Sequence, residues 1–177
     1  MKTATTVKST ATLGALVKDY VIYNAWVTKT LIDWLKNKPS ETLEQVVPSS
    51  FPSIKETLIH IWDTQRFWLS VIEQSTPPQS FRFGFEGTIQ DVFEGFEEQS
   101  DEFVTFVTSL SEADLQEEVS FDTPWVKGTQ SRFEFIHHCI NHSSYHRGQL
   151  VTIGRNVGIT DAPMTDYSFY LLMVKGK

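Results

Sequence analysis

The sequence predicts an all-α four-helix bundle with a short C-terminal helical tail, on three observations. Apolar residues recur every three or four positions through four long stretches, the period of a helix buried on one face. Capping residues or prolines bound these stretches, and none of them alternates apolar and polar residues as a strand does. The length of 177 residues suits one domain, so we expect a single domain over residues 1–177, with residues 1–9 flexible.

The first helix is expected from about Thr12 to the Lys-Asn-Lys-Pro run at 36–39, since proline does not continue a helix. Asn24 interrupts its apolar face. A buried Asn side chain needs hydrogen-bond partners, so we expect Asn24 either to line a pocket or to bond a neighbouring helix. The apolar members of this face are Leu13, Leu16, Val17, Tyr20, Val27, Leu31, Trp34 and Leu35.

The second helix is expected from about Ile54 to Glu73. Ser53 and Glu56 have the spacing of a capping box, in which the Ser oxygen takes a free backbone N–H and the Glu side chain reaches back. The Pro-Pro pair at 77–78 ends the segment.

The third helix is expected to begin after Thr88, with Asp91 at its third position as a capping partner. Residues 77–87 before it form a loop rich in aromatic side chains. Residues 111–119 after it form a polar connection with room for one helical turn. Residues 120–130 contain a proline and a glycine, so they read as a loop or a short hairpin.

The fourth helix is expected to begin at Ser131 and Glu134, which repeat the spacing of a capping box. We expect it to end near Arg155, with Gly158 beyond it as a stop signal. A short aromatic tail near residues 167–173 is then expected to dock on the body as a last helical turn.

Charge and cysteine content limit the function classes. The formal net charge is -7, and an acidic surface repels phosphates, which argues against nucleic-acid and anionic-membrane partners. The single cysteine, Cys139, excludes an internal disulfide framework and fits a reducing compartment. The apolar run Leu13–Val17 is too short to span a membrane and lacks the pattern of a signal peptide, so we expect a cytoplasmic protein.

The histidines are the clearest functional signal. His142 and His146 are four residues apart, so they project from one helix face with Cβ atoms roughly 6 Å apart and can chelate one ion. Their neighbours on that face are largely apolar, which places the pair toward the bundle interior. The alternative is a pair of hydrogen-bonded core histidines, and an unpartnered imidazole would then cost about 1–3 kcal/mol.

A metal site needs a third ligand, and His60 on the second helix is the natural candidate. Three histidines with one open position form the ligand set of a catalytic site, whereas structural zinc sites have four protein ligands. His138 lies one turn before His142. Because His138, His142 and His146 together span about 12 Å of helix, they cannot all bind one ion. We therefore expect His138 to support a ligand or to be a bystander.

Two more residues are candidates to support the ligands or line the pocket. Asp63 lies one turn after His60 and can orient its ring, and a solvated helix Asp is the alternative. Gln149 lies on the metal-facing side of the fourth helix. Arg147 faces away from it, so we expect packing or pairing there, and Gly148 is expected to let another helix approach closely.

Several segments together carry a family resemblance. The run from Asn141 to Leu150 has the pattern HxxxHRGQ, the second helix carries His60 and Trp68 in a similar setting, and weaker elements lie at 24–26 and 163–167. In this combination the chain resembles the DinB-like family of metal-binding four-helix bundles, also called YfiT-like metal-dependent hydrolases.

The resemblance implies that His60, His142 and His146 hold one divalent metal ion, which would be zinc, nickel, manganese or iron. It also implies a homodimer. The fourth helix has a second apolar face, around Phe133 and Ile140, that can meet either the C-terminal tail or a second subunit, and we expect a dimer. Relatives include thiol S-transferases that act with low-molecular-weight thiols. We therefore expect a small-molecule substrate and an enzyme, a hydrolase or thiol S-transferase, whose metal activates a thiol or water. The alternative is a non-catalytic bundle that binds a metal or a partner.

Overall fold

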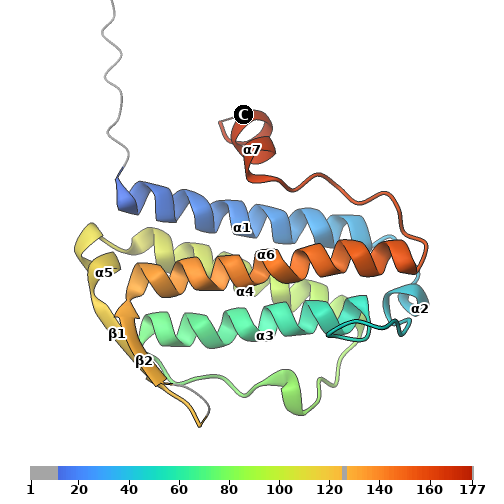
Figure 1. Cartoon of the computed structure of the whole chain (residues 1–177), viewed down its shortest axis with the longest axis horizontal. Coiled ribbons are helices and arrows are strands. Elements are labelled where there is room, and N and C mark those ends of the chain that lie inside the picture. Colours follow the sequence, from blue (N-terminus) through green and yellow to red (C-terminus); the bar gives the residue numbers. More distant parts are fainter. Residues whose placement is uncertain (1–11, 125–126, 177) are drawn as a thin grey trace, which may run out of the picture.

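The computed structural model describes residues 12–124 and 127–176, and four long helices form its body (Figure 1). The expected all-α bundle is confirmed. The flexibility expected of residues 1–9 concerns a segment outside the described residues. The four long helices are α1 (Leu13–Leu35), α3 (Ile54–Glu73), α4 (Ile89–Ser109) and α6 (Arg132–Asn156).

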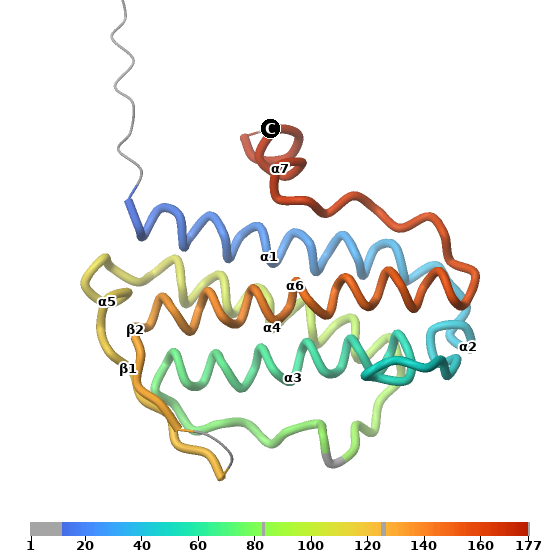
Figure 2. The backbone as a smooth tube through the Cα atoms, in the orientation of Figure 1, coloured from blue at the N-terminus to red at the C-terminus, as the bar shows by residue number. Residues whose placement is uncertain are grey.

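The order of the helices around the bundle brings α3 and α6 together. Helices α1 and α6 run in one direction, while α3 and α4 run in the other (Figure 2). The connection from α3 to α4 therefore returns along the outside of the bundle over residues 74–88. Helix α3 packs against α6 and α4, and α1 packs against the same two helices. Residues of the second and fourth expected helices can thus meet across the α3–α6 interface.

The smaller elements lie at the ends and on the outside of the bundle (Figure 1). Strands β1 and β2 pair antiparallel, with Val119 opposite Gln130, so the segment expected to be a loop or a hairpin is a hairpin. The C-terminal segment lies along the outside of α1. These elements are α2 (Ser40–Leu43), the 3-10 turn η1 (Phe81–Phe83), α5 (Glu112–Gln116), β1 (Glu118–Asp122), β2 (Lys127–Ser131), α7 (Tyr167–Phe169) and the π-helical turn η2 (Tyr170–Val174).

Local capping explains where the long helices begin. The Ser53 side chain accepts a hydrogen bond from the backbone N–H of Glu56 at 3.1 Å, so α3 begins where expected. Thr88 and Ser131 each form a complete capping box with the acidic residue three positions later. After α6, Gly158 adopts a φ of 89°, a left-handed conformation that side chains disfavour, and so marks the helix end.

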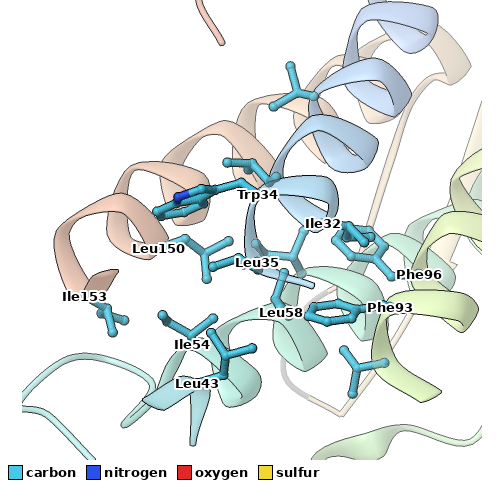
Figure 3. Close-up of a cluster of buried hydrophobic side chains, with 14 of the residues drawn as sticks. Ile32, Trp34, Leu35, Leu43, Ile54, Leu58, Phe93, Phe96, Leu150 and Ile153 are labelled. Carbon is cyan, nitrogen blue, oxygen red and sulfur yellow. The ribbon is translucent and has the colours of Figure 1, made fainter. Parts of the chain in front are cut away.

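The hydrophobic core consists of two clusters placed along the bundle. Figure 3 shows the first, in which side chains from α1, α2, α3, α4 and α6 converge. It is drawn with Ile32, Trp34, Leu35, Leu43, Ile54, Leu58, Phe93, Phe96, Leu150 and Ile153. The second lies toward the hairpin and centres on Val21, Phe103, Val107, Leu115, Ile136 and Ile140.

Two expectations about packing are corrected. Leu16 belongs to the apolar stripe of α1 but is 56% exposed, because no helix among the described residues covers the groove between the first halves of α1 and α6. Gly148 was expected to allow close helix packing, yet a Cβ atom there would meet nothing within 4 Å. Within residues 12–124 and 127–176, no helix combines the length and apolar character needed to cross a bilayer.

Candidate metal centre

His60 of α3 meets His142 and His146 of α6 in the groove between the two helices. The Nε2 atom of His146 lies 3.1 Å from Nε2 of His60 and 3.2 Å from Nε2 of His142. One nitrogen from each ring falls within a group whose members all lie within 4.8 Å of one another. The spacing of four residues explains the pair on α6, and the contact between α3 and α6 supplies the third ring.

The donor set fits a divalent ion. Imidazole nitrogens bind Zn²⁺ at about 2.0–2.1 Å, so the nitrogens of a tetrahedral site are separated by roughly 3.4 Å. The separations of 3.1 and 3.2 Å among the three Nε2 atoms are close to that value. In the described part of the chain the group comprises these three residues, so they could hold a metal ion and leave one tetrahedral position open.

Burial keeps the imidazoles neutral. It lowers the pKa of His60 to about 4, with further lowering from the neighbouring charges of His146 and His142. Burial also lowers the pKa of His142 to about 4, and it lowers the pKa of His146. A neutral imidazole keeps a lone pair for a metal ion, so the site needs no deprotonation at neutral pH.

Gln149 contacts the far side of the His146 ring. Its Oε1 atom lies 2.7 Å from Nδ1 of His146, and its Nε2 atom donates to Oγ of Ser50 at 3.3 Å. An amide oxygen only accepts, so it selects the tautomer of His146 that carries the proton on Nδ1. Nε2 of His146 is then unprotonated and faces the other two rings, which fits the position expected of Gln149 at the pocket.

Aromatic rings flank the site. Phe51, in the loop before α3, stacks on the His60 ring with centroids 4.0 Å apart and meets the His146 ring edge-on at 5.5 Å. Tyr145 lies edge-on to His146 at 4.9 Å. Helical periodicity does not point to Phe51, because a loop residue follows no helical repeat.

Three other candidates have contacts that define their roles. Asp63 accepts hydrogen bonds from the Ser80 hydroxyl at 2.5 Å and the Phe81 N–H at 3.1 Å, so its carboxylate holds the α3–α4 connection. These contacts lend no support to a role in orienting His60. His138 is exposed and lies edge-on to Trp68 at 4.6 Å. Its ring centroid is 6.1 Å from that of His142, but His138 is not a member of the three-histidine group.

Asn24 is buried and bonds neighbouring helices, the second of the two roles expected for it. It donates to Gln65 on α3 and accepts from Arg147 on α6. Arg147 therefore pairs inside the bundle and does not face the histidine group. His137, also on α6, is exposed and stacks against Tyr20 of α1 with ring centroids 6.4 Å apart.

A small cleft of about 210 Å³ adjoins the site where the loop before α3 approaches α6. Gln149 and Tyr145 line the cleft and also contact His146, so the cleft and the histidine group share a wall. The remaining lining residues carry no formal charge. They are Pro48, Ser49, Gly148, Thr152, Ile153 and Asn156.

Comparisons with known proteins give a family match and two similar folds. The model of the DinB family matches residues 4–174. The protein DinB of Bacillus subtilis (strain 168) is 30% identical over 161 residues, which cover 86% of this chain and 92% of that protein.

Two solved structures share the fold. One is a DinB-like protein from Bacillus cereus ATCC 10987, with a TM-score of 0.66, 21% identity, and coverage of 81% of this chain and 91% of that one. The other is a DinB-like protein from Bacillus subtilis, with a TM-score of 0.62, 19% identity, and coverage of 85% and 97%.

Proposed function

The chain belongs to the DinB family, and on that premise we propose that it is a metal-dependent enzyme whose ion is held by His60, His142 and His146. The observation that carries the proposal is the convergence of three neutral imidazole nitrogens with separations of 3.1 and 3.2 Å. Three protein ligands leave a coordination position for substrate, as in catalytic sites. Zinc, nickel, manganese and iron all suit imidazole ligands.

The proposed reaction is thiol S-transfer or hydrolysis of a small molecule. A divalent ion with neutral ligands keeps its charge and acts as a Lewis acid that lowers the pKa of a bound thiol or water. Gln149 holds Nδ1 of His146 in its protonated form, and Phe51 covers one side of the His60 ring and limits the access of water there. Low-molecular-weight thiols are abundant in the reducing cytoplasm, where we place the chain, and the free cysteine Cys139 fits that compartment.

Metal content is the first test, measured by mass spectrometry on protein reconstituted separately with Zn²⁺, Ni²⁺, Mn²⁺ and Fe²⁺. We expect about one ion per chain, and its loss in His60→Gln and in His142→Gln. His137→Gln is the matched control, since His137 is an exposed histidine on the same helix as His142. A chain that binds none of these ions, or a His60→Gln variant with unchanged content, would refute the three-histidine site.

Turnover is the second test. The loaded protein is incubated with small electrophiles in the presence and absence of a thiol, and with amides and esters. Turnover that depends on the metal and on His142 supports an enzyme. One bound ion without turnover of any of these compounds would support the alternative, a non-catalytic metal-binding bundle.

We also propose that the chain forms a homodimer through the groove between α1 and α6. This groove has a volume of about 510 Å³, and its walls are mostly apolar. Tyr20 lines the groove and packs against Tyr167 of the C-terminal segment, in which Leu172 is 79% exposed. A twofold axis would place the same patch on both copies. Its lining includes Leu13, Leu16, Tyr20, Phe133, His137 and Ile140.

Light scattering tests the dimer. Leu16→Glu places a charge in the groove, and we expect it to halve the mass in solution. Val46→Glu is the matched control, because Val46 is 76% exposed in the loop after α2, away from the groove. A wild-type monomer, or a Leu16→Glu variant that remains dimeric, would contradict this interface.

A further inference from the structure

A layer of polar side chains separates the two hydrophobic clusters at the middle of the bundle. Asn24 of α1, Gln65 of α3, Gln99 and Ser100 of α4, and Arg147 of α6 are all buried. In each helix they lie between residues of the first cluster and residues of the second. The layer therefore connects all four helices at one level between the two apolar clusters.

Hydrogen bonds run through this layer as one chain. Arg147 Nη1 donates to Oδ1 of Asn24 at 2.5 Å, and Nδ2 of Asn24 donates to Oε1 of Gln65 at 2.9 Å. Nε2 of Gln65 then donates to Oε1 of Gln99 at 2.6 Å and to the Ser100 hydroxyl at 3.2 Å. The path thus crosses from α6 to α1, then to α3, and ends on α4.

Arg147 fixes the direction of every bond in this chain. A guanidinium has only donors, so the oxygen of Asn24 must face it, and the Asn24 nitrogen must face Gln65. The same reasoning turns the oxygen of Gln65 toward Asn24 and its nitrogen toward Gln99. The chain therefore ends on a donor, Nε2 of Gln99, and this atom is buried without a partner among the described residues.

The guanidinium is itself an unusual group at this position. Arg147 is 6% exposed, and no described carboxylate lies within ion-pair distance of it. Its contacts are Asn24, the Ser144 hydroxyl at 2.8 Å and the Tyr23 ring, whose centroid lies 6.0 Å from the guanidinium carbon. Burial lowers the pKa of Arg147 to about 10, which leaves it charged at neutral pH. A buried charge is costly to desolvate, and in some proteins such a group specifies one arrangement of its neighbours.

We propose that Arg147 is the positioning residue of the histidine site, acting through Asn24 and Gln65. Arg147 directly follows His146 on α6, and Gln65 lies on α3 five residues after His60. The hydrogen bonds that run from Arg147 through Asn24 to Gln65 fix the position of α3 along α6. They thereby set the separation of 3.1 Å between Nε2 of His60 and Nε2 of His146. This inference rests on the proposed function for its metal readout, while the helix register is measured without metal.

Arg147→Met tests the role of the donor, with Arg155→Met as the matched control. Arg155 is an exposed arginine on the same helix and lies outside the polar layer. We expect Arg147→Met to weaken metal binding by about 10–100-fold in chelator competition, the range found when groups supporting metal ligands are removed. Arg155→Met should stay within about twofold of wild type. A folded Arg147→Met variant with wild-type affinity would overturn the proposal and leave Arg147 a contributor to stability alone.

Substitutions at Asn24 test the donor-to-acceptor direction of these hydrogen bonds, and they remain informative if the Arg147→Met variant does not fold. Asn24→Asp keeps two acceptors for Arg147 but cannot donate to Gln65. The Gln65 and Gln99 amides should then both rotate, so that the Gln65 nitrogen donates to position 24 and the Gln65 oxygen accepts from Nε2 of Gln99. We expect the Gln99 side-chain amide protons to become protected from solvent exchange in NMR spectra, with metal affinity within about threefold of wild type. Asn24→Leu should lose affinity as Arg147→Met does.

Crystal structures of the metal-free variants measure the register of α3 relative to α6. We expect the distance between Nε2 of His60 and Nε2 of His146 to widen by about 1 Å or more in Asn24→Leu and to be retained in Asn24→Asp. An unchanged distance in Asn24→Leu overturns the positioning role whether or not the wild type binds metal. Conversely, a wild type that binds no metal, with the distance widened in Asn24→Leu, refutes the proposed function and leaves the positioning role intact.

Discussion

Two glycines in the middle of long helices should respond in opposite directions to the same substitution. A Cβ atom at Gly95 of α4 would lie 2.3 Å from Cη2 and Cζ2 of Trp62 on α3. Since carbon atoms in contact prefer about 3.5–4.0 Å, the indole would have to move by roughly 1.2 Å or more. Phe81 and Phe85 restrict that movement, with ring centroids 4.5 and 5.6 Å from the indole.

The expected magnitudes follow from these contacts. Overpacking costs about 1–3 kcal/mol, and the higher helix propensity of alanine returns about 1 kcal/mol, so Gly95→Ala should lower the free energy of unfolding by about 1 kcal/mol. Gly148→Ala has only the propensity gain, because a Cβ atom there meets nothing within 4 Å. It should raise the free energy of unfolding by about 0.5–1 kcal/mol.

Thermal and urea unfolding, followed by circular dichroism on metal-free protein, measure the difference. A gap of about 2 kcal/mol corresponds to melting temperatures separated by roughly 4–8 °C for a chain of this size. The wild type should fall between the two variants. If Gly95→Ala proved as stable as Gly148→Ala, the packing of Trp62 against α4 would be wrong.

Three further predictions concern the site and its surroundings. Gln149→Leu removes the acceptor 2.7 Å from Nδ1 of His146 and should weaken metal binding by about 10–100-fold in chelator competition. Gln149→Glu keeps an acceptor there and should preserve the metal affinity. A Gln149→Leu variant with wild-type metal affinity would contradict the role of that hydrogen bond. The pKa values of His60 and His142 are about 4 in the folded protein, against 6.5 in the unfolded chain. Between pH 4 and pH 6.5 the unfolded chain therefore binds more protons than the folded protein. The free energy of unfolding should then fall as the pH drops from 6.5 to 4. Urea titrations of metal-free protein at several pH values measure this slope, which should be shallower in the double variant His60→Gln/His142→Gln; an equal slope would speak against the lowered pKa values. Burial raises the pKa of the Cys139 thiol to about 12, so iodoacetamide at pH 8 should modify Cys139 only after unfolding. Mass spectrometry measures the labelling. Equal labelling of native and denatured protein would contradict the burial of Cys139.

The helix boundaries were predictable because their causes are local. The α3 start needs only Ser53 and the N–H of Glu56, and the α6 start needs only Ser131 and Glu134. Helix α2 was not predicted, because a helix of four residues is too short to show the helical repeat of apolar residues.

The metal ligands were predictable for a similar reason. A spacing of four residues fixes His142 and His146 on one face of any helix, and His60 is the one histidine on another long helix. The contacts of Asp63 were not predictable, because its partners Ser80 and Phe81 lie in a connection whose path depends on the whole fold.

Exposure was the property that sequence patterns described least well. The periodicity that includes Leu16 shows which face of α1 is apolar, but it does not show whether another element covers that face. Gly148 illustrates the same point, because the absence of a side chain is compatible with either close packing or open space. At both positions the tertiary structure determines whether the residue is covered by another element.

The origin of the histidines in distant parts of the sequence links the site to folding. His60 and His146 are separated by 86 positions, whereas His142 and His146 lie on one helix. An ion bound by all three therefore cross-links the chain across α4 and the hairpin, while an unfolded chain retains only the local pair. Such a ligand favours the native state, by about 2.7 kcal/mol when its free concentration is 100 times the dissociation constant. The lifetime of this protein against proteolysis would then rise and fall with the supply of metal in the cell.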